Sequence, residues 1–263
     1  MQRILTIVDK EWAEVFKNPA VLVTVLLLPL VFTFLPLGIL FAMRSGAPGD
    51  STDLPPRFEQ LCAQTAGATG GACLQIYIVD EFLLLYMMMP LAIPSAIAAY
   101  SIVGEKTTRS LEPLLATPVS TEELLAAKSL AAVVPAVLAT WGAFAIFVLG
   151  MPLVGAAPAV YRSLFGPTWL VAILLVGPLL AVLAVNFAIM VSSRVSDPRA
   201  AQQVSMVVIV PLLGLLFGQI AGLLVLNTAL MLGVAVALAM VDAGLVFVGA
   251  RLFQREAILT QWK

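Results

Sequence analysis

Histidine is absent from this 263-residue chain, and charged residues make up only 11% of it. The lack of histidine removes the side chain most often used as a general base and as a metal ligand. A soluble domain carries about a quarter charged residues, so a surface with so few charges must face lipid. Hydrophobic residues make up 61% of the chain. The composition therefore predicts a membrane protein, and a formal net charge of −1 gives it no general affinity for nucleic acid.

The hydrophobic residues form long unbroken runs. A membrane β-barrel shows short alternating segments instead, whereas about 20 consecutive apolar residues cross the hydrocarbon core as a helix. We therefore expect an all-α polytopic membrane protein with six transmembrane helices in a single domain over residues 1–263. The expected spans are 20–43, 80–103, 129–149, 168–193, 200–217 and 228–250. Asn18-Pro19 and Ser196-Asp197-Pro198 predict helix starts, with a polar N-cap before a proline.

Residues 1–18 precede the first span and are amphipathic. Ile4, Val8, Trp12 and Val15 recur at helical spacing, with charged residues between them. The segment can lie as a helix in the headgroup plane, or it can simply extend the first span. The pattern favours the interfacial helix.

Lysine and arginine are distributed unevenly between the two sides of the expected bundle. Eleven of the fourteen fall on the side of the termini, and three fall on the other side. These three are Arg44, Arg57 and Arg162. Because cytoplasmic segments are enriched in these residues, we expect a multi-pass protein of the cell membrane with both termini in the cytoplasm.

Both cysteines, Cys62 and Cys73, lie in the polar loop expected over residues 44–79. The expected orientation places this loop outside the cell, where disulfides persist. A bridge would close a loop of about a dozen residues, which contributes about 3 kcal/mol in the chain-entropy model. Two free thiols are the alternative. Asp80 and Glu81 follow this loop, and we expect them to cap the second span.

The segment 104–120, between the second and third spans, is longer and more patterned than a turn requires. Leu111, Leu114 and Leu115 would share one face of a short helix, and Thr117-Pro118 would end it. Charged residues flank this face: Glu105, Lys106, Arg109 and Glu112. Such a helix can fit a groove on a partner protein or rest on lipid, and the pattern alone leaves both open.

The run from Gly104 to Lys128 reads GEKTTRSLEPLLATPVSTEELLAAK. It resembles the signature of type-2 ABC permeases, the six-helix membrane subunits of ABC exporters, including the sodium and drug extrusion branches. The family usually has Gly-Thr where this chain has Arg109-Ser110, while the leucine and Thr-Pro positions match. The tail 252–260 also resembles that family, so the likeness covers nearly the whole chain.

The resemblance implies a permease that forms a translocation path and pairs with a second permease chain, identical or different. It also implies that segment 104–120 contains the coupling helix, which docks on a nucleotide-binding ATPase subunit. The implied coupling residues are Glu105, Lys106, Arg109, Leu111, Glu112, Leu114 and Leu115. The sequence has no Gly-x4-Gly-Lys-Ser/Thr phosphate loop. We therefore expect ATP and Mg to be bound by the partner subunit, and no catalytic residue, cofactor or metal in this chain.

Asp242 is the one acidic residue deep within an expected span. Counted back from Arg251 at 1.5 Å per residue, it lies about 13 Å into the membrane. A buried carboxylate usually faces a bundle interior or a water-filled path. Asp242, together with Asn186, is therefore our candidate for the translocation path. The alternative is a carboxyl group that holds two helices together by a hydrogen bond, with Asn186 as its partner.

Other classes of function compete with the ABC permease. A gradient-driven secondary transporter would need more intramembrane charges and an internal repeat, and neither is evident. An intramembrane enzyme would need a catalytic constellation, which the sequence does not offer. A scaffold subunit of a larger membrane complex stays open.

The first testable prediction is the disulfide between Cys62 and Cys73. Intact-mass measurement with alkylation before and after reduction should show two alkylated thiols only after reduction. Alkylation of both thiols without a reductant would contradict the bridge.

Overall fold

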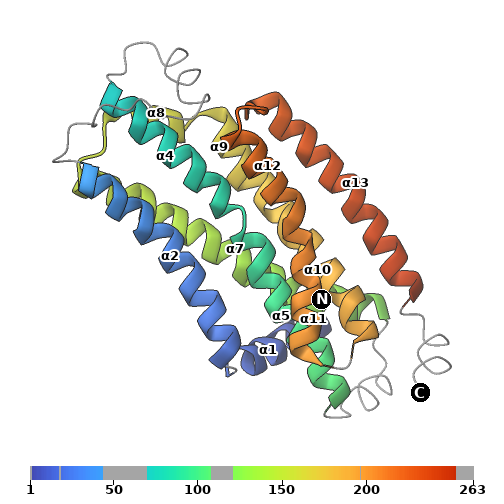
Figure 1. Ribbon diagram of the computed structural model, residues 1–263. Coiled ribbons are helices and arrows are strands. Elements are labelled where there is room, and N and C mark those ends of the chain that lie inside the picture. The colour runs from blue at the N-terminus through green and yellow to red at the C-terminus, as the bar shows by residue number, and fades with distance from the viewer. Residues whose placement is uncertain (1, 18, 44–69, 108–120, 196, 253–263) are drawn as a thin grey trace.

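The computed structural model describes residues 2–17, 19–43, 70–107, 121–195 and 197–252 (Figure 1). Six of its helical stretches are long and apolar enough to span a membrane, which confirms the expected number. The spans are α2 (Pro19–Met43), α4 (Gly70–Tyr86) with α5 (Met89–Thr107), α7 (Thr121–Val154), α9 (Pro167–Val171) with η1 (Ala172–Val176) and α10 (Gly177–Arg194), α11 (Pro198–Ser205) with η2 (Met206–Ile209) and α12 (Val210–Ile220), and α13 (Thr228–Leu252). Helix α1 (Gln2–Val15) precedes them, and α8 (Pro158–Leu164) lies between α7 and α9.

The second span starts about ten residues earlier than expected. Residues 70–79 are helical rather than part of the loop predicted over 44–79. Cys73, Ile76, Val79 and Leu83 are spaced three or four residues apart and are all buried. Their common face packs into the bundle. The stabilisation from this burial exceeds the local preference of the glycine and polar residues for a loop, which the prediction had followed.

The second span is also the centre of the bundle, as Figure 1 shows for α4 and α5. Of its most apolar stretch, 83% is buried, against 17% to 44% for the other five spans. Helix α10 packs along α5, and the two helices bring buried alanines to their faces: Ala92, Ala96 and Ala99 on α5, and Ala181, Ala184 and Ala188 on α10. Small residues allow two helix backbones to approach closely in a membrane.

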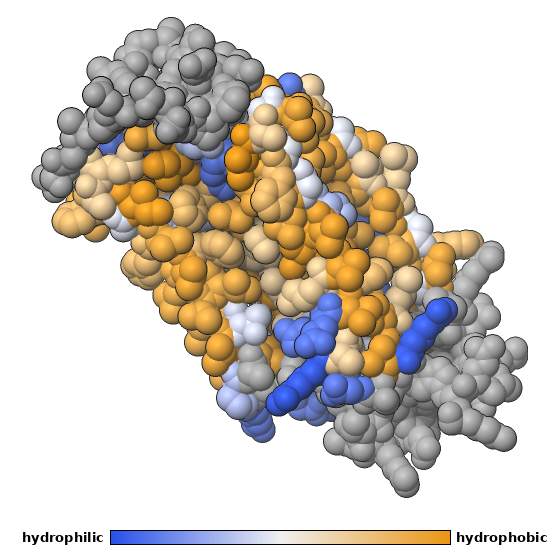
Figure 2. Space-filling view, in the orientation of Figure 1, coloured by the Kyte–Doolittle hydropathy of each residue, from blue (hydrophilic) through white to orange (hydrophobic). Residues whose placement is uncertain are grey.

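The face of the bundle seen in Figure 2 is apolar over its middle, and polar residues gather mostly at its lower end. Leucine, valine and phenylalanine side chains are exposed along α2, α7, α12 and α13. Exposed apolar surface on this scale is unfavourable in water and favourable in lipid, so the surface agrees with the six spans.

The central span is broken between α4 and α5, at Met87 and Met88. Pro90 has no N–H to donate back into the preceding turn. The Met87 and Met88 amides instead bond the carbonyls three residues earlier, at 3.1 and 2.9 Å. The chain therefore makes one tight turn and then resumes as α5.

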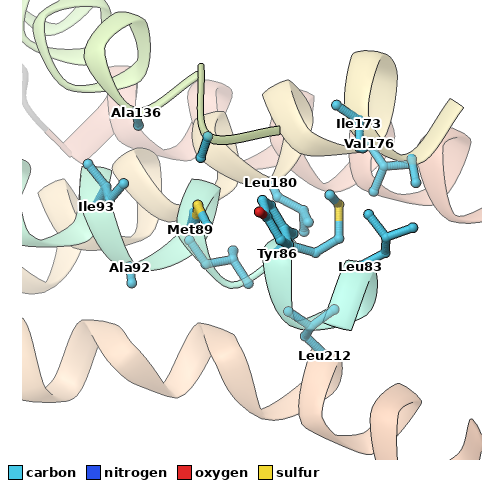
Figure 3. Packing of buried hydrophobic residues seen from close by; sticks show 14 of the residues in the cluster. Leu83, Tyr86, Met89, Ala92, Ile93, Ala136, Ile173, Val176, Leu180 and Leu212 are labelled. Carbon is cyan, nitrogen blue, oxygen red and sulfur yellow. The ribbon is translucent and has the colours of Figure 1, made fainter. Parts of the chain in front are cut away.

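Tyr86, the last residue of α4, fixes this broken turn to two other spans. Its hydroxyl donates a hydrogen bond of 3.1 Å to Thr33 Oγ1 on α2, and Thr33 donates in turn to the Ala143 carbonyl of α7 at 3.4 Å. The Tyr86 ring packs against Phe147, with ring centroids 5.9 Å apart. Figure 3 shows Tyr86 enclosed by Leu83, Met89 and Leu180.

A second irregularity lies in the fourth span, where η1 is a π-helical turn. The Gly177 amide bonds the Ala172 carbonyl, five residues back, and Pro178 has no N–H. The Ile173 carbonyl therefore lacks a partner in its own helix. Trp141 Nε1 on α7 donates to it at 3.1 Å, so the wide turn becomes a point of attachment between two spans.

We predict that Tyr86→Phe lowers stability by about 1 kcal/mol, because it removes one buried hydrogen bond and keeps the ring packing. Tyr86→Ala should cost about 3–5 kcal/mol, because the ring contacts are lost as well. Thermal unfolding of the purified chain in detergent measures both. Equal losses for the two variants would show that the hydroxyl, rather than the ring, holds the turn.

Candidate functional site

The bundle has two ends, which we name for the elements that lie there. The base is the end where α1 lies and α13 finishes, and the top is the end where α8 lies (Figure 1). Further polar contacts between helices lie at these two ends.

At the base, the expected coupling segment 104–120 connects α5 to α7. Glu105 and Lys106 belong to the last turn of α5, which ends at Thr107, and α7 begins at Thr121. The other five expected coupling residues, Arg109, Leu111, Glu112, Leu114 and Leu115, lie outside the described residues, so the coupling helix stays a prediction. The structure does show what the segment is tied to: one end continues the central span, and the other continues α7.

Helix α1 packs against the first turns of α7. Val8 forms a buried cluster with Ala127 and Ala131, and Ile4, Ile7 and Trp12 pack around it. Trp12 Nε1 donates a hydrogen bond of 2.9 Å to the Ala131 carbonyl. The apolar face of this amphipathic helix thus rests on protein, and its placement in the headgroup plane stays a prediction.

A buried ion pair lies at the same contact. Lys128 Nζ donates to Glu11 Oε1 at 2.7 Å, and the two residues are only 5% and 2% exposed. Lys128 closes the signature-like run that begins at Gly104. Two charges removed from water repay their desolvation only when they stay together, so the pair fixes how α1 sits on α7.

At the top, two adjacent acidic residues of α4 bond to different spans. Asp80 Oδ1 accepts a hydrogen bond of 2.9 Å from Trp169 Nε1 on α9. Glu81 Oε1 accepts one of 3.2 Å from the fully buried Gln219 on α12. The expectation that Asp80 and Glu81 cap a helix is wrong, because α4 begins ten residues before them.

Two further contacts complete the top. Gln75 Oε1 accepts from the Ala157 amide at 2.8 Å, just before α8. The hydroxyls of Thr168 and Thr228 lie 3.0 Å apart and join α9 to α13. Together with the contacts of Asp80 and Glu81, they join α4 to α9, to α12 and to the start of α8, and they join α9 to α13.

Asp242 and Asn186 lie on neighbouring spans, α13 and α10, which pack against each other. Asp242 is 6% exposed. Within the described residues, both of its carboxylate oxygens and Asn186 Nδ2 are buried without a hydrogen-bond partner. The structure therefore does not form the hydrogen bond that we considered between these two side chains.

Cys73 lies near the start of α4, is 1% exposed and is disulfide-bonded. Cys62 lies outside the described residues. The described part of the chain contains no free cysteine, and the pairing of Cys62 with Cys73 stays a prediction.

The family model described as "ABC-2 family transporter protein" matches residues 5–261. The chain belongs to the ABC-2 transporter family. With its six apolar helices, it is a membrane-spanning permease of an ABC transporter. Membership implies an ABC ATPase as its partner. No curated protein matches the chain.

Sequence reasoning missed the residues that join the spans of this ABC-2 permease. Glu11 carried a usable signal, because it falls beside Val8, Trp12 and Val15 on the apolar face of α1. A charged residue at such a position calls for a buried partner. The choice of Lys128, 117 residues away, carries no local signal.

We predict that breaking the ion pair destabilises the permease strongly. Glu11→Leu or Lys128→Met alone should cost about 3–5 kcal/mol, because each leaves one buried charge without its partner. The double variant Glu11→Leu with Lys128→Met should recover most of the loss, since no buried charge remains. Thermal unfolding of the four proteins gives the coupling energy.

The matched control is Lys10→Ala, one residue away on the same helix. Lys10 pairs with Glu14 at 3.6 Å, and their side chains are 40% and 58% exposed. Its removal should change stability by no more than about 0.5 kcal/mol. If the control and Lys128→Met have equal effects, the Glu11–Lys128 pair does not hold α1 on α7.

Proposed function

We propose that this permease belongs to an ATP-driven exporter of the cell membrane and forms its translocation path. Its base faces the cytoplasm, as the lysine and arginine distribution favours, and both termini lie there. A separate nucleotide-binding subunit docks on segment 104–120. The observation that carries this proposal is the family membership, joined to the way the segment continues the most buried span of the bundle.

The attachment of the segment supports a coupling role. A displacement at residues 108–120 acts directly on α5 and α7, because both helices continue from it. Helix α5 lies at the centre of the bundle and packs against α10 and α7. Helix α1 braces the start of α7 through Trp12 and the Glu11–Lys128 pair. A force that reaches the start of α7 therefore acts on a helix that is packed against α1, α5 and α10.

ATP and Mg are bound by the partner subunit in this proposal. The chain carries no phosphate-binding loop of the Gly-x4-Gly-Lys-Ser/Thr kind. Leu111, Leu114 and Leu115 supply the apolar centre of the docking surface. Glu105, Lys106, Arg109 and Glu112 form its polar rim, which is the usual arrangement at a protein interface.

The translocation path is proposed to form with a second permease chain, identical or different. The centre of a single bundle is filled by α4 and α5 and their tightly packed side chains (Figure 3). A path for a substrate therefore needs a wall from another chain. Asp242 and Asn186 are the polar side chains we propose to meet this path when α13 separates from α10.

We predict that Leu114→Asp releases the ATPase subunit or uncouples its ATP hydrolysis from transport. Burying one leucine is worth about 1.5–3 kcal/mol, and the variant also places a charge in the apolar centre. Copurification of the ATPase and substrate-stimulated ATP hydrolysis in proteoliposomes measure the effect.

The matched control is Leu223→Asp, the same substitution in the connection between α12 and α13 at the top. Leu223 is 80% exposed, so its replacement should leave folding and ATPase binding unchanged. If Leu114→Asp folds, binds the ATPase and transports at the original rate, segment 104–120 is not the coupling element.

A further inference from the structure

Helix α13 is the span with the least buried surface, and its acidic residue lies on the small part that is buried. Only 17% of its most apolar stretch is covered by the rest of the chain. Among its described side chains, Met231, Ala235 and Asp242 are buried. They are spaced four and seven residues apart, so they share the face that packs on α9, η1 and α10, which we call the seam. Asp242 occupies a buried position on this face, where an apolar residue would carry no electrostatic cost.

Within the described residues, the helices that pack most closely on α13 offer Asp242 no counter-charge near it. Helix α9 and η1 contain no ionisable residue, and α10 contains only Arg194, in its last turn. Helix α7, which touches α13 lightly, carries Glu122, Glu123 and Lys128 near its start at the base. Lys128 is engaged by Glu11. Asp242 therefore faces apolar side chains and the amide-bearing helix α10.

The register of the two parallel helices shows how far Arg194 is from Asp242. Thr168 and Thr228 mark the same level, because their hydroxyls lie 3.0 Å apart. Asp242 is 14 residues beyond Thr228, and Arg194 is 26 residues beyond Thr168. The difference of 12 residues corresponds to about 18 Å along the helices, too far for an ion pair.

The chemistry of the seam decides which ligand it can hold. Na⁺, Mg²⁺ or Ca²⁺ would need several oxygen ligands around it, whereas α9, η1, α10 and α13 together contain one carboxyl side chain, that of Asp242. Both carboxyl oxygens of Asp242 are buried without a hydrogen-bond partner in the described residues, so the closed seam leaves no room for an organic cation beside them. A proton needs only one of these oxygens, and it removes the charge whose burial is unfavourable.

We propose that Asp242 is a proton-binding site, which holds a proton while α13 is packed on α10 and releases it to water when the seam opens. On opening, the O–H bond of the carboxylic acid breaks, the electron pair stays on the carboxylate, and water takes the proton. Closing reverses the step. The release step rests on the proposed function, because it needs the moving permease, but the protonated state of the closed seam does not.

Infrared spectroscopy of the full-length chain in lipid nanodiscs tests the protonated state without the ATPase. The spectrum of the wild type minus that of Asp242→Asn should show the carbonyl stretch of a carboxylic acid at neutral pH. The band should be equally strong in sodium and in potassium buffer. The matched control is Asp197→Asn: Asp197 is an exposed N-cap that accepts from the Arg199 and Ala200 amides, so its difference spectrum should show a carboxylate instead.

A carboxylate band for Asp242 at neutral pH would overturn the proposal. So would a carboxylic acid band that disappears when sodium replaces potassium, because the site would then bind a metal cation.

The release step is tested in proteoliposomes with the ATPase partner. Transport by the wild type should vary with pH, and Asp242→Asn, which keeps the shape but cannot titrate, should lose that dependence. An unchanged pH profile overturns the release step. A complex without ATP-driven transport overturns the proposed function instead, and leaves the infrared result standing.

Discussion

The bilayer offers no water to pair with a polar group, and this constraint shapes the fold where a helix is irregular. A helix that breaks inside lipid must find new partners for its freed carbonyls and amides within the protein. The π-helical turn of the fourth span leaves the Ile173 carbonyl without a partner in its own helix. Trp141 Nε1 of another span donates a hydrogen bond to it. The hydroxyls of Ser95, Thr140 and Ser205 each donate to the carbonyl four residues earlier in the same helix. Two irregular turns of this permease, the π-helical turn and the break after Tyr86, are therefore also places where spans are joined to one another.

Hydropathy was enough to predict the six spans, because an unbroken apolar run has few alternatives in a membrane. Local chemistry also predicted the start of α11, where the Asp197 carboxylate accepts from two backbone amides. The start of α4 was missed, since the burial of Cys73 and Ile76 depends on neighbouring helices that the local sequence does not show. The bonds of Trp169 to Asp80 and of Lys128 to Glu11 join residues 89 and 117 positions apart, and nothing local selects such partners. Of the candidate site, Asp242 was found because a lone charge in an apolar run is conspicuous.

Two of the buried acidic residues, Glu11 and Asp242, show how position decides the role of a charge. Glu11 forms an ion pair with Lys128 at the base, in the contact between α1 and α7. A paired charge of this kind fixes geometry, because separating the partners leaves each one buried alone. Asp242 has no such partner within the described residues, so its neutral form is the one compatible with the packed seam. One residue therefore supports a rigid joint, and the other makes the packing of its helix depend on its protonation.

These contacts also indicate where the bundle can move at least cost. The central span cannot shift alone, because Tyr86 ties it to α2 and α7 and the top contacts tie it to α9 and α12. Few residues of helix α13 are buried, and it touches mainly one neighbouring span, to which the hydroxyl pair of Thr168 and Thr228 joins it at the top. Free energy lost on separating two elements grows with the surface they bury, so α13 separates most easily. The seam that opens with the least loss of packing is then the one that contains Asp242. When it opens, water stabilises the carboxylate that forms as Asp242 releases its proton.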